Sequence, residues 1–302
     1  MQEDLLNAYK EQLPKYKKLD WLNIFLIFIT IASFIIALIQ FHYSPKNAPE
    51  YIYSIFLVLL IIFLIIYTYI RESRRYHRYS ESILHIFYAQ QRVKEYLTSL
   101  NENDTKNLKG ICKDIVNVIS NCFSLLTSKN CHISIKHVDT NGKITTFVRD
   151  NKSNTRYHDK PKEEEHYINE NTDFEFIETK HRRYFISNDL QRLWTLKKYK
   201  NSSFKIVGEP EIKESSLKLR DKVVNWNLDY KSTLVVPIRY ITNDNNYYNF
   251  GFLCIDANSK NIFNKKIDPE LSMIFADLLC TLMSQEILIT ENIVLKYNAP
   301  KI

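Results

Sequence analysis

The segments STLVVPIRY (Ser232–Tyr240) and FGFLCIDA (Phe250–Ala257) decide the fold of the larger, C-terminal part of this chain. Both are rich in β-branched and aromatic residues, which favours strands, and the polar turn Asn243–Asn246 lies between them. Pro237 has no N–H group to donate to a neighbouring strand, so we expect it at a sheet edge or at a bulge. The two segments therefore predict the centre of an antiparallel sheet.

Further strands and helices are predicted on both sides of these segments. Alternation of apolar and polar residues predicts a hairpin of His132–Val138 and Ile144–Arg149, joined by a turn at Thr140–Lys143. Apolar residues at helical spacing predict one helix before the hairpin and a closing helix near the C-terminus, at Asn107–Leu126 and Ile267–Ile289.

The segment between the hairpin and the later strands is less regular. The polar composition of Asn151–Asn171 predicts a long surface loop. Short strands are expected at Phe174–Glu178 and at Tyr184–Leu190. Asn188 or Asp189 is expected to cap a short helix that begins where the second of these strands ends.

Two apolar runs near the N-terminus, Leu22–Phe41 and Ile52–Ile70, contain no charged residue and are each long enough to span a bilayer. Lys and Arg residues gather outside the pair, and the loop between the runs carries only Lys46, so both termini are expected in the cytoplasm. We predict a multi-pass protein of the bacterial inner membrane. Its expected parts are a cytoplasmic segment (1–21), a transmembrane helix (22–41), an external loop (42–51), a second transmembrane helix (52–70), a helical connector (71–100), a sensory domain (107–291) and a tail (292–302).

The connector carries a heptad pattern, which keeps one side of a helix facing a partner helix. It therefore predicts a coiled coil and a homo-oligomer, a dimer or higher. A helix that packs against its own domain would account for the same pattern, and this alternative stays open. The expected a and d positions are Tyr76, Tyr79, Ile83, Ile86, Gln90, Val93, Leu97 and Leu100.

Small and polar residues recur along one stripe of the first apolar run. Such a stripe avoids the acyl chains, so it is either a static packing seam between helices or the lining of a polar passage in an oligomer. Its members are Asn23, Thr30, Ser33, Ala37 and Gln40.

The order of helix, antiparallel hairpin, variable segment, two strands and closing helix resembles the GAF domain, a small-molecule sensory module related to PAS. The resemblance is carried by Ser232–Ile238, Gly251–Asp256, Phe263 and the closing helix. It implies an α+β domain with a central antiparallel sheet. The chain as a whole then resembles a membrane-anchored sensory protein.

In GAF domains a ligand lies between the sheet and the variable central segment, so the resemblance implies a pocket built from Tyr184–Leu190 and Tyr199–Tyr230. Aromatic residues at this density are also typical of a hydrophobic core, which stays open as an alternative. The Asn-Lys-Phe-Asp-Glu signature of cyclic-nucleotide-binding members is not reproduced beyond Asn264 and Lys265. The implied wall residues are Phe185, Asn188, Asp189, Tyr199, Trp226 and Tyr230.

No motif in the sequence points to catalysis, to a cofactor or to a metal. The chain has 4 glycines, too dispersed for a phosphate-binding loop, and its 5 cysteines show no paired spacing. The net charge of +7 is attributed in part to the basic residues beside the apolar runs, so direct DNA binding is not expected. We expect a protein that is not an enzyme.

Two hypotheses for function follow. No output module follows the sensory domain in this sequence, so we expect a signal to leave through the membrane helices or through a separate protein. In the first hypothesis a nucleotide-like messenger, or a protein or ribonucleoprotein encoded nearby, triggers the spans to perturb the bilayer. This layout resembles that of abortive-infection effectors in antiphage defence. In the alternative, the chain is a membrane-tethered regulatory subunit that docks a separate kinase or cyclase.

Overall fold

The computed structural model of the chain describes Ile29, Ser33 and the ranges 48–101, 107–154, 166–213, 222–241 and 247–298. The chain divides into two compact units, Met1–Glu81 and Ser82–Ile302. Helix α3 (Ala48–Asn101) contributes residues to both units.

Within the first unit, α3 exposes many large apolar side chains. The predicted second span, 52–70, lies in this helix. Of the polar stripe predicted on the first span, Ser33 is helical and exposed, and Asn23, Thr30, Ala37 and Gln40 lie outside the described residues. Over the residues that the structure describes, no helix is long and apolar enough to cross a bilayer. The exposed side chains of α3 include Phe56, Leu57, Leu60, Ile61, Ile65 and Tyr69.

Within the second unit, α3 buries one stripe of small and apolar residues. Ala89, Val93 and Tyr96 are buried, and the Cys122 thiol of helix α4 (Leu108–Thr127) donates a long hydrogen bond to the Ser82 carbonyl oxygen at 4.0 Å. The predicted heptad seam does not follow this stripe, because its members Ile83 and Gln90 are exposed whereas Val93 is buried. This part of α3 packs against its own domain, as in the alternative interpretation of the heptad.

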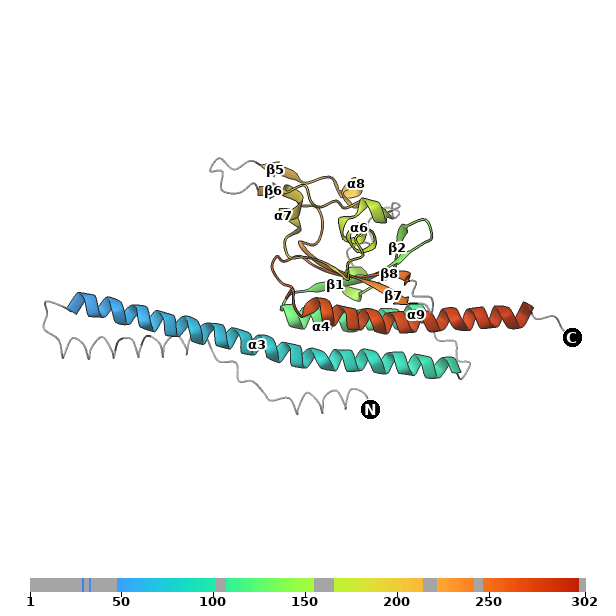
Figure 1. Cartoon of the computed structure of the whole chain (residues 1–302), viewed down its shortest axis with the longest axis horizontal. Coiled ribbons are helices and arrows are strands. Elements are labelled where there is room, and N and C mark those ends of the chain that lie inside the picture. Colours follow the sequence, from blue (N-terminus) through green and yellow to red (C-terminus); the bar gives the residue numbers. More distant parts are fainter. Residues whose placement is uncertain are drawn as a thin grey trace. The chain divides into compact units, whose positions relative to one another are not determined.

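A six-stranded antiparallel sheet, in the order β3-β2-β1-β8-β7-β4, forms the centre of the second unit (Figure 1). It confirms both the predicted hairpin, which is β1 and β2, and the predicted pair of later strands, which is β7 and β8. A separate two-stranded ribbon consists of β5 (Glu211–Lys213) and β6 (Lys222–Val224). The strands of the large sheet are β1 (Cys131–Val138), β2 (Lys143–Arg149), β3 (His166–Tyr167), β4 (Phe185–Ser187), β7 (Ser232–Ile241) and β8 (Tyr247–Ala257).

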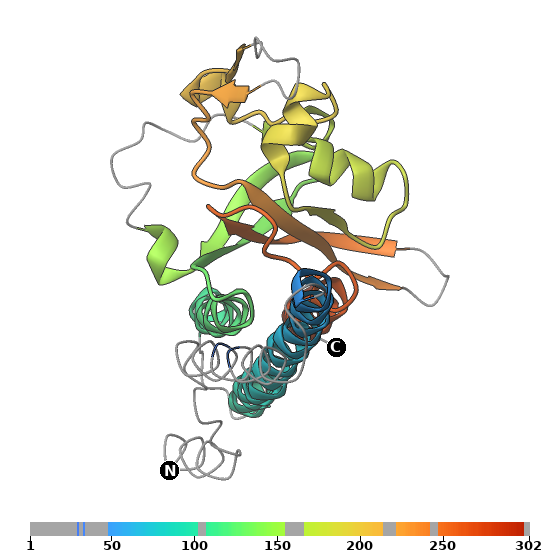
Figure 2. The ribbon, with the colours of Figure 1, turned by 90° about the vertical axis from the view of Figure 1, so that its left-hand side faces the viewer.

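The two long helices α4 and α9 (Asp268–Asn298) cover one face of this sheet (Figures 1 and 2). The side chain of Asn107 accepts a hydrogen bond from the Lys109 N–H and so caps the start of α4. Alternate strand residues such as Ile133 and Leu253 are fully buried, and the rings of Phe123 and Phe275 lie 6.5 Å apart between the helices. The main apolar core of the domain therefore lies between the sheet and these two helices.

Short elements cover the opposite face of the sheet, in the upper part of Figure 1. An aromatic cluster holds them there: the Phe174 ring lies 4.7 Å from that of Phe252, and the Phe204 ring lies 4.7 Å from Trp194 and 5.5 Å from Trp226. The elements of the covering segment are the short 3₁₀-helix η1 (Ile168–Glu170), α6 (Thr172–Glu178), α7 (Leu190–Thr195), α8 (Phe204–Val207) and the β5–β6 ribbon.

The structure corrects two predictions in this segment. Residues 174–178 form part of helix α6 and not a strand, because Phe174 and Ile177, three residues apart, are both buried. The predicted surface loop 151–171 contains helix α5 (Asn151–Asn154), β3 and η1, with residues 155–165 outside the described part. The predicted cap is confirmed at Asp189, whose carboxylate accepts a hydrogen bond from the Arg192 N–H at 3.0 Å at the start of α7.

Two residues of strands β7 and β8 are required by the position that they occupy in the sheet. Pro237 lies beyond the last residue of β7 that pairs with β4, and one residue before the irregularity at Ile238 and Arg239, as predicted from its missing N–H. Gly251 has φ +147°, and a Cβ there would lie 1.8 Å from the Lys136 carbonyl oxygen. Strands β8 and β1 can approach this closely only because residue 251 has no side chain.

Candidate ligand-binding cavity

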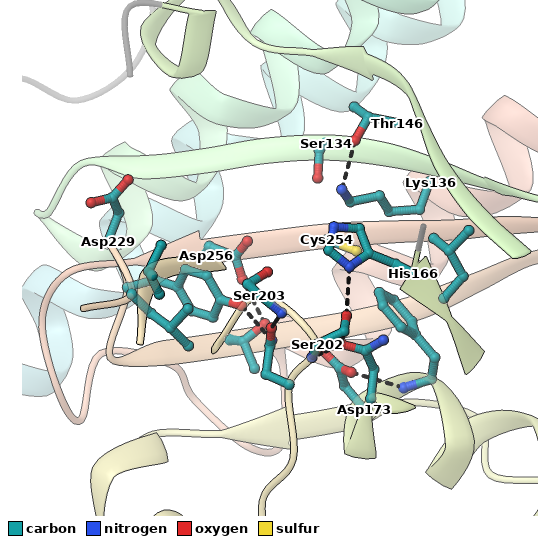
Figure 3. A pocket seen from close by; sticks show the side chains of 18 of the residues that line it. Ser134, Lys136, Thr146, His166, Asp173, Ser202, Ser203, Asp229, Cys254 and Asp256 are labelled. Atoms are coloured by element: carbon teal, nitrogen blue, oxygen red, sulfur yellow. Dashed lines mark hydrogen bonds between the residues drawn. The ribbon is translucent and has the colours of Figure 1, made fainter. Parts of the chain in front are cut away.

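A cavity of about 380 Å³ lies between the sheet and the segment that covers it (Figure 3). Ligand pockets in proteins have volumes of roughly 300 to 1,000 Å³, so this cavity suits a molecule of metabolite size. Residues of β1, β2, β7 and β8 form its floor, and residues of the covering segment form its roof. The cavity is therefore in the place that the resemblance to GAF domains implied.

Two basic side chains converge on one wall of the cavity. Lys136 Nζ donates a hydrogen bond to Thr146 Oγ1 at 2.7 Å, and Arg149 Nη2 donates to the same oxygen at 3.1 Å. Lys136 and Thr146 are directly paired across β1 and β2. A register shift at Ile135 and Lys136 allows Thr146 and Arg149, three residues apart, to face the same cavity. This wall, Ser134, Lys136, Thr146 and Arg149, is called the basic wall below.

Acidic side chains occupy the other part of the cavity, and Asp173 of α6 is the most deeply buried of them, at 4% exposure. Its Oδ1 accepts a hydrogen bond from the Phe174 N–H at 3.0 Å. Asp256 of β8 accepts a hydrogen bond from the Thr233 hydroxyl at 2.6 Å. Asp173 and Asp256 are called the acidic pair below.

Burial raises the pKa of Asp173 to about 7, because an ionised carboxylate is poorly solvated in this position. This value of the pKa already includes a smaller rise caused by the negative charge of Asp256, and the lowering caused by the hydrogen bond from the Phe174 N–H and by the positive charge of Lys136. A carboxyl group with such a pKa in a cavity marks a candidate functional site.

A polar network lines the side of the cavity next to the acidic pair. Asn171 Oδ1 accepts hydrogen bonds from the backbone N–H and the hydroxyl of Ser202, both at 3.0 Å. The His166 Nδ1 atom lies 2.7 Å from Ser202 Oγ, an interaction that Figure 3 shows across the cavity. These bonds hold β3, η1 and the segment before α8 together.

Of the wall residues that the sequence analysis named, Tyr230 lines the cavity. Its hydroxyl accepts a hydrogen bond from Asn201 Nδ2 at 2.8 Å, and the same amide donates to the Tyr199 hydroxyl at 2.9 Å. Trp226 Nε1 donates to the Tyr230 carbonyl oxygen at 2.7 Å. Tyr199 and Trp226 therefore hold Tyr230 and belong to the aromatic cluster behind the wall.

The other three named residues lie away from the cavity lining. Phe185 is buried in the aromatic cluster. Asn188 makes hydrogen bonds to the backbone N–H and carbonyl of Phe263. Asp189 caps α7 and pairs with Lys260 at 2.9 Å. These side chains fix the connections around the sheet.

Cys254 lies in the cavity floor and is buried. Burial raises its pKa well above the ordinary value of a thiol, so it is a neutral thiol and a poor nucleophile. All five cysteines are free and buried. Among the described residues there is no group of His, Cys, Asp and Glu that could hold a metal ion.

The basic wall and Asp173 were not predicted from the sequence. A signal for the first was present, because alternation in the predicted strand places Ser134 and Lys136 on the side opposite to Ile133 and Ile135. No comparable signal identified Asp173, because the residues that follow it, 174–178, were predicted as a strand and not as a helix.

Comparison with known proteins gave structural matches alone, since no family model and no curated protein matches the chain. Similar solved structures include the GAF domain of a phosphoenolpyruvate-protein phosphotransferase from Acinetobacter, at 12% identity and a TM-score of 0.39, over 65% of this chain and 90% of that chain. A type II free methionine-R-sulfoxide reductase from Thermoplasma acidophilum matches at 16% identity and a TM-score of 0.35, over 59% of this chain and 96% of that chain. A far-red cyanobacteriochrome photoreceptor matches at 12% identity and a TM-score of 0.37, over 65% of this chain and 96% of that chain.

These matches span sensor domains and an enzyme, so they do not indicate a ligand or an activity for this chain. The assignment of a GAF-like α+β domain rests on its own topology: the curled antiparallel sheet, the two long helices on one face and the covered cavity on the other.

Proposed function

We propose that the second unit is a sensory domain that binds a small polar molecule in the cavity between the sheet and its covering segment. One observation carries this proposal: a cavity of about 380 Å³ is lined by charged side chains of both signs, one of them an aspartate at 4% exposure. Burying a charged group costs stability unless a partner compensates for it. A polar ligand bound in the cavity would compensate for the burial of this aspartate.

Thermal unfolding of the full chain in detergent, measured in the presence of individual polar metabolites, tests this proposal. A ligand at a hundred times its Kd stabilises the protein by about 2.7 kcal/mol. The matched control is Ser203→Trp, whose large side chain would fill the cavity. Ser203 is suitable because its side chain makes no hydrogen bond that caps α8, so the replacement removes no such bond. We expect stabilisation of the natural chain and none of the variant. Equal stabilisation of both, or none of either, contradicts the proposal.

The signal is proposed to leave the cavity through α4 and α3. Ser120 Oγ of α4 donates to the Cys131 carbonyl oxygen at the start of β1, at 2.9 Å, and Cys122 of α4 contacts Ser82 of α3. A displacement of β1 therefore reaches α3 through buried contacts. We expect ligand binding to change amide hydrogen exchange in residues 82–99. Exchange that stays unchanged there while the ligand is bound contradicts this route.

The output is proposed to be perturbation of the bacterial inner membrane, as an abortive-infection effector in antiphage defence. The apolar side chains that α3 exposes in the first unit, such as Phe56 and Ile65, support contact with lipid, since such a surface is unfavourable in water. Expression with the trigger should depolarise cells. Leucine at Asn23, Thr30 and Gln40 should suppress the toxicity if the predicted polar stripe lines a passage. Retained membrane potential in triggered cells contradicts this output.

The alternative output, docking of a separate kinase or cyclase, is favoured by the exposed Ile83 and Phe87 on the part of α3 that belongs to the sensory domain. The same two side chains are also suited to a second copy of this chain. Replacing residues 22–70 by an unrelated membrane hairpin distinguishes the two outputs. Function retained after the replacement supports docking, and function lost supports an active role of the natural segment.

A further inference from the structure

We propose that a ligand enters the cavity between the end of α8 and the loop that contains Asn227, and that Asn227 is a latch that closes this entrance. This inference rests on the proposed function, because it concerns access to the same cavity. It follows from the exposure of the residues that line the cavity and from the hydrogen bonds that hold its roof together.

The entrance is marked by two lining residues that are exposed to solvent. Ile206 of α8 is 39% exposed, and Asn227, in the loop after the β5–β6 ribbon, is exposed as well. The other residues that line the cavity are buried or half-buried. We therefore place the entrance between the end of α8 and this loop.

The Asn227 side chain bridges the two sides of this entrance. Its Nδ2 donates hydrogen bonds to the carbonyl oxygens of Val207 and Gly208, at 2.8 Å and 3.4 Å. Carbonyl groups at the end of a helix have no partner within the helix, so a side chain can hold them. Because Asn227 is exposed, water can replace its bonds when they break, and opening the latch leaves no buried group without a partner.

The roof is held more firmly before α8 than at its end. The Thr172 N–H donates to the Lys200 carbonyl oxygen at 3.1 Å, and the Lys200 N–H donates to Thr172 Oγ1 at 2.7 Å. Phe204, the first residue of α8, is 4% exposed, and its ring packs against the rings of Trp194 and Trp226. The start of α8 is therefore fixed to the aromatic cluster.

The end of α8 is able to move relative to this fixed start. Gly208 follows the helix with φ +86°, and glycine changes its backbone conformation at little steric cost. At the start of α8, the Asn201 amide already joins the same two segments by its hydrogen bond to the Tyr230 hydroxyl, at 2.8 Å. Breaking the Asn227 bonds therefore opens the outer end of the roof, at residues 206–208, while the rest stays in place.

Alkylation by iodoacetamide of the full chain in detergent, with mass spectrometry of its peptides, measures access to the cavity. Cys254 lies in the cavity floor, and the other four cysteines are buried outside the cavity lining, so they are internal controls. The variants are Asn227→Ala and Asn227→Asp, which keeps the shape of the side chain but removes the amide donor. Asn141→Ala, at an exposed asparagine in the turn between β1 and β2, is the matched control.

The expected change follows from the strength of one hydrogen bond, which shifts an equilibrium between closed and open forms by about twofold to tenfold. Labelling of a transiently exposed group follows the population of the open form. We therefore expect both variants at Asn227 to be alkylated at Cys254 about twofold to tenfold faster than the natural chain, with unchanged rates at the other cysteines. Asn141→Ala should behave as the natural chain, and Ser203→Trp, which fills the cavity, should slow the labelling of Cys254.

An unchanged rate at Cys254 in both variants at Asn227 overturns the latch. An equal rise at all five cysteines also overturns it, because it shows a loss of global stability. Neither result affects ligand binding, which thermal unfolding of the natural chain and of Ser203→Trp measures separately. Faster labelling of Cys254 alone, together with no ligand in that assay, refutes the sensory function and supports the latch.

Discussion

Replacing Asp173 by Asn should stabilise the ligand-free protein, although Asp173 is central to the proposed site. Asn has nearly the same shape, and its side-chain oxygen can still accept the hydrogen bond from the Phe174 N–H. The folded state raises the pKa of Asp173 from 3.8 to about 7. A carboxyl group with a raised pKa holds its proton more tightly in the folded state, so it costs stability as the pH rises from about 4 to about 7.

The size of this cost follows from about 1.36 kcal/mol per pKa unit. The pKa of Asp173 rises by about three units on folding, so its ionisation lowers the free energy of unfolding by about 4 kcal/mol above pH 7. At pH 5 the same free energy is lowered by about 2 kcal/mol. We therefore expect Asp173→Asn to increase the free energy of unfolding by an amount that grows with pH and becomes constant above pH 7. As the pH falls below about 4, the carboxyl group becomes neutral in the unfolded state as well, so the difference in stability should approach zero.

Chemical denaturation of the full chain in detergent, followed by tryptophan fluorescence between pH 4 and pH 8, measures this difference. The matched control is Asp114→Asn, which removes the same charge from an exposed position on α4. The control should change stability by no more than about 0.5 kcal/mol at any pH. A variant at Asp173 that is less stable than the natural protein at pH 8, or a difference that does not depend on pH, would refute the reasoning.

Three further predictions concern the fold, the helix and the ligand. Gly251→Ala should destabilise the second unit by about 3 kcal/mol or more in chemical denaturation, because its Cβ would lie 1.8 Å from the Lys136 carbonyl oxygen. Gly208→Ala is the control for backbone strain alone, because Gly208 also has a positive φ, of +86°, but its Cβ would meet only the Asn227 side chain, at 3.5 Å; it should cost less. Tyr96→Ala should lower the free energy of unfolding by about 3 to 5 kcal/mol, because the Tyr96 side chain is only 1% exposed. Ile83→Ala, on the exposed side of the same helix, should lower it by less than about 1 kcal/mol. The affinity for the ligand of the cavity should differ between pH 5.5 and pH 7.5, because Asp173 gains its negative charge across this interval, and calorimetry at the two pH values measures the difference.

Local sequence patterns predicted the main strands of the sheet. Alternation predicted β1 and β2, and richness in β-branched and aromatic residues predicted β7 and β8. The missing N–H of Pro237 predicted an edge or a bulge, and Pro237 lies just beyond the part of β7 that pairs with β4. These features depend on neighbouring residues along the chain, so they are visible in the sequence. The closing helix was recognisable for the same reason.

The cavity was less predictable, because it depends on contacts between distant segments. Arg149 faces the same cavity as Thr146 through a register irregularity in the hairpin, which no alternating pattern reveals. The alternation of Phe174 and Phe176 imitates a strand, although burial of Phe174 and Ile177 on the sheet selects a helix. The aromatic residues named as wall residues mostly support the wall, as in the alternative that they belong to a core.

The central claim is that the charged cavity binds a small polar molecule. Equilibrium dialysis of the full chain against a defined mixture of polar metabolites, with mass spectrometry of the retained compounds, tests it most directly. The natural chain should retain one class of compound at about one molecule per site, and the double variant Lys136→Met, Asp173→Asn should retain none. Equal retention by both proteins, or no retention by the natural chain, would contradict the account.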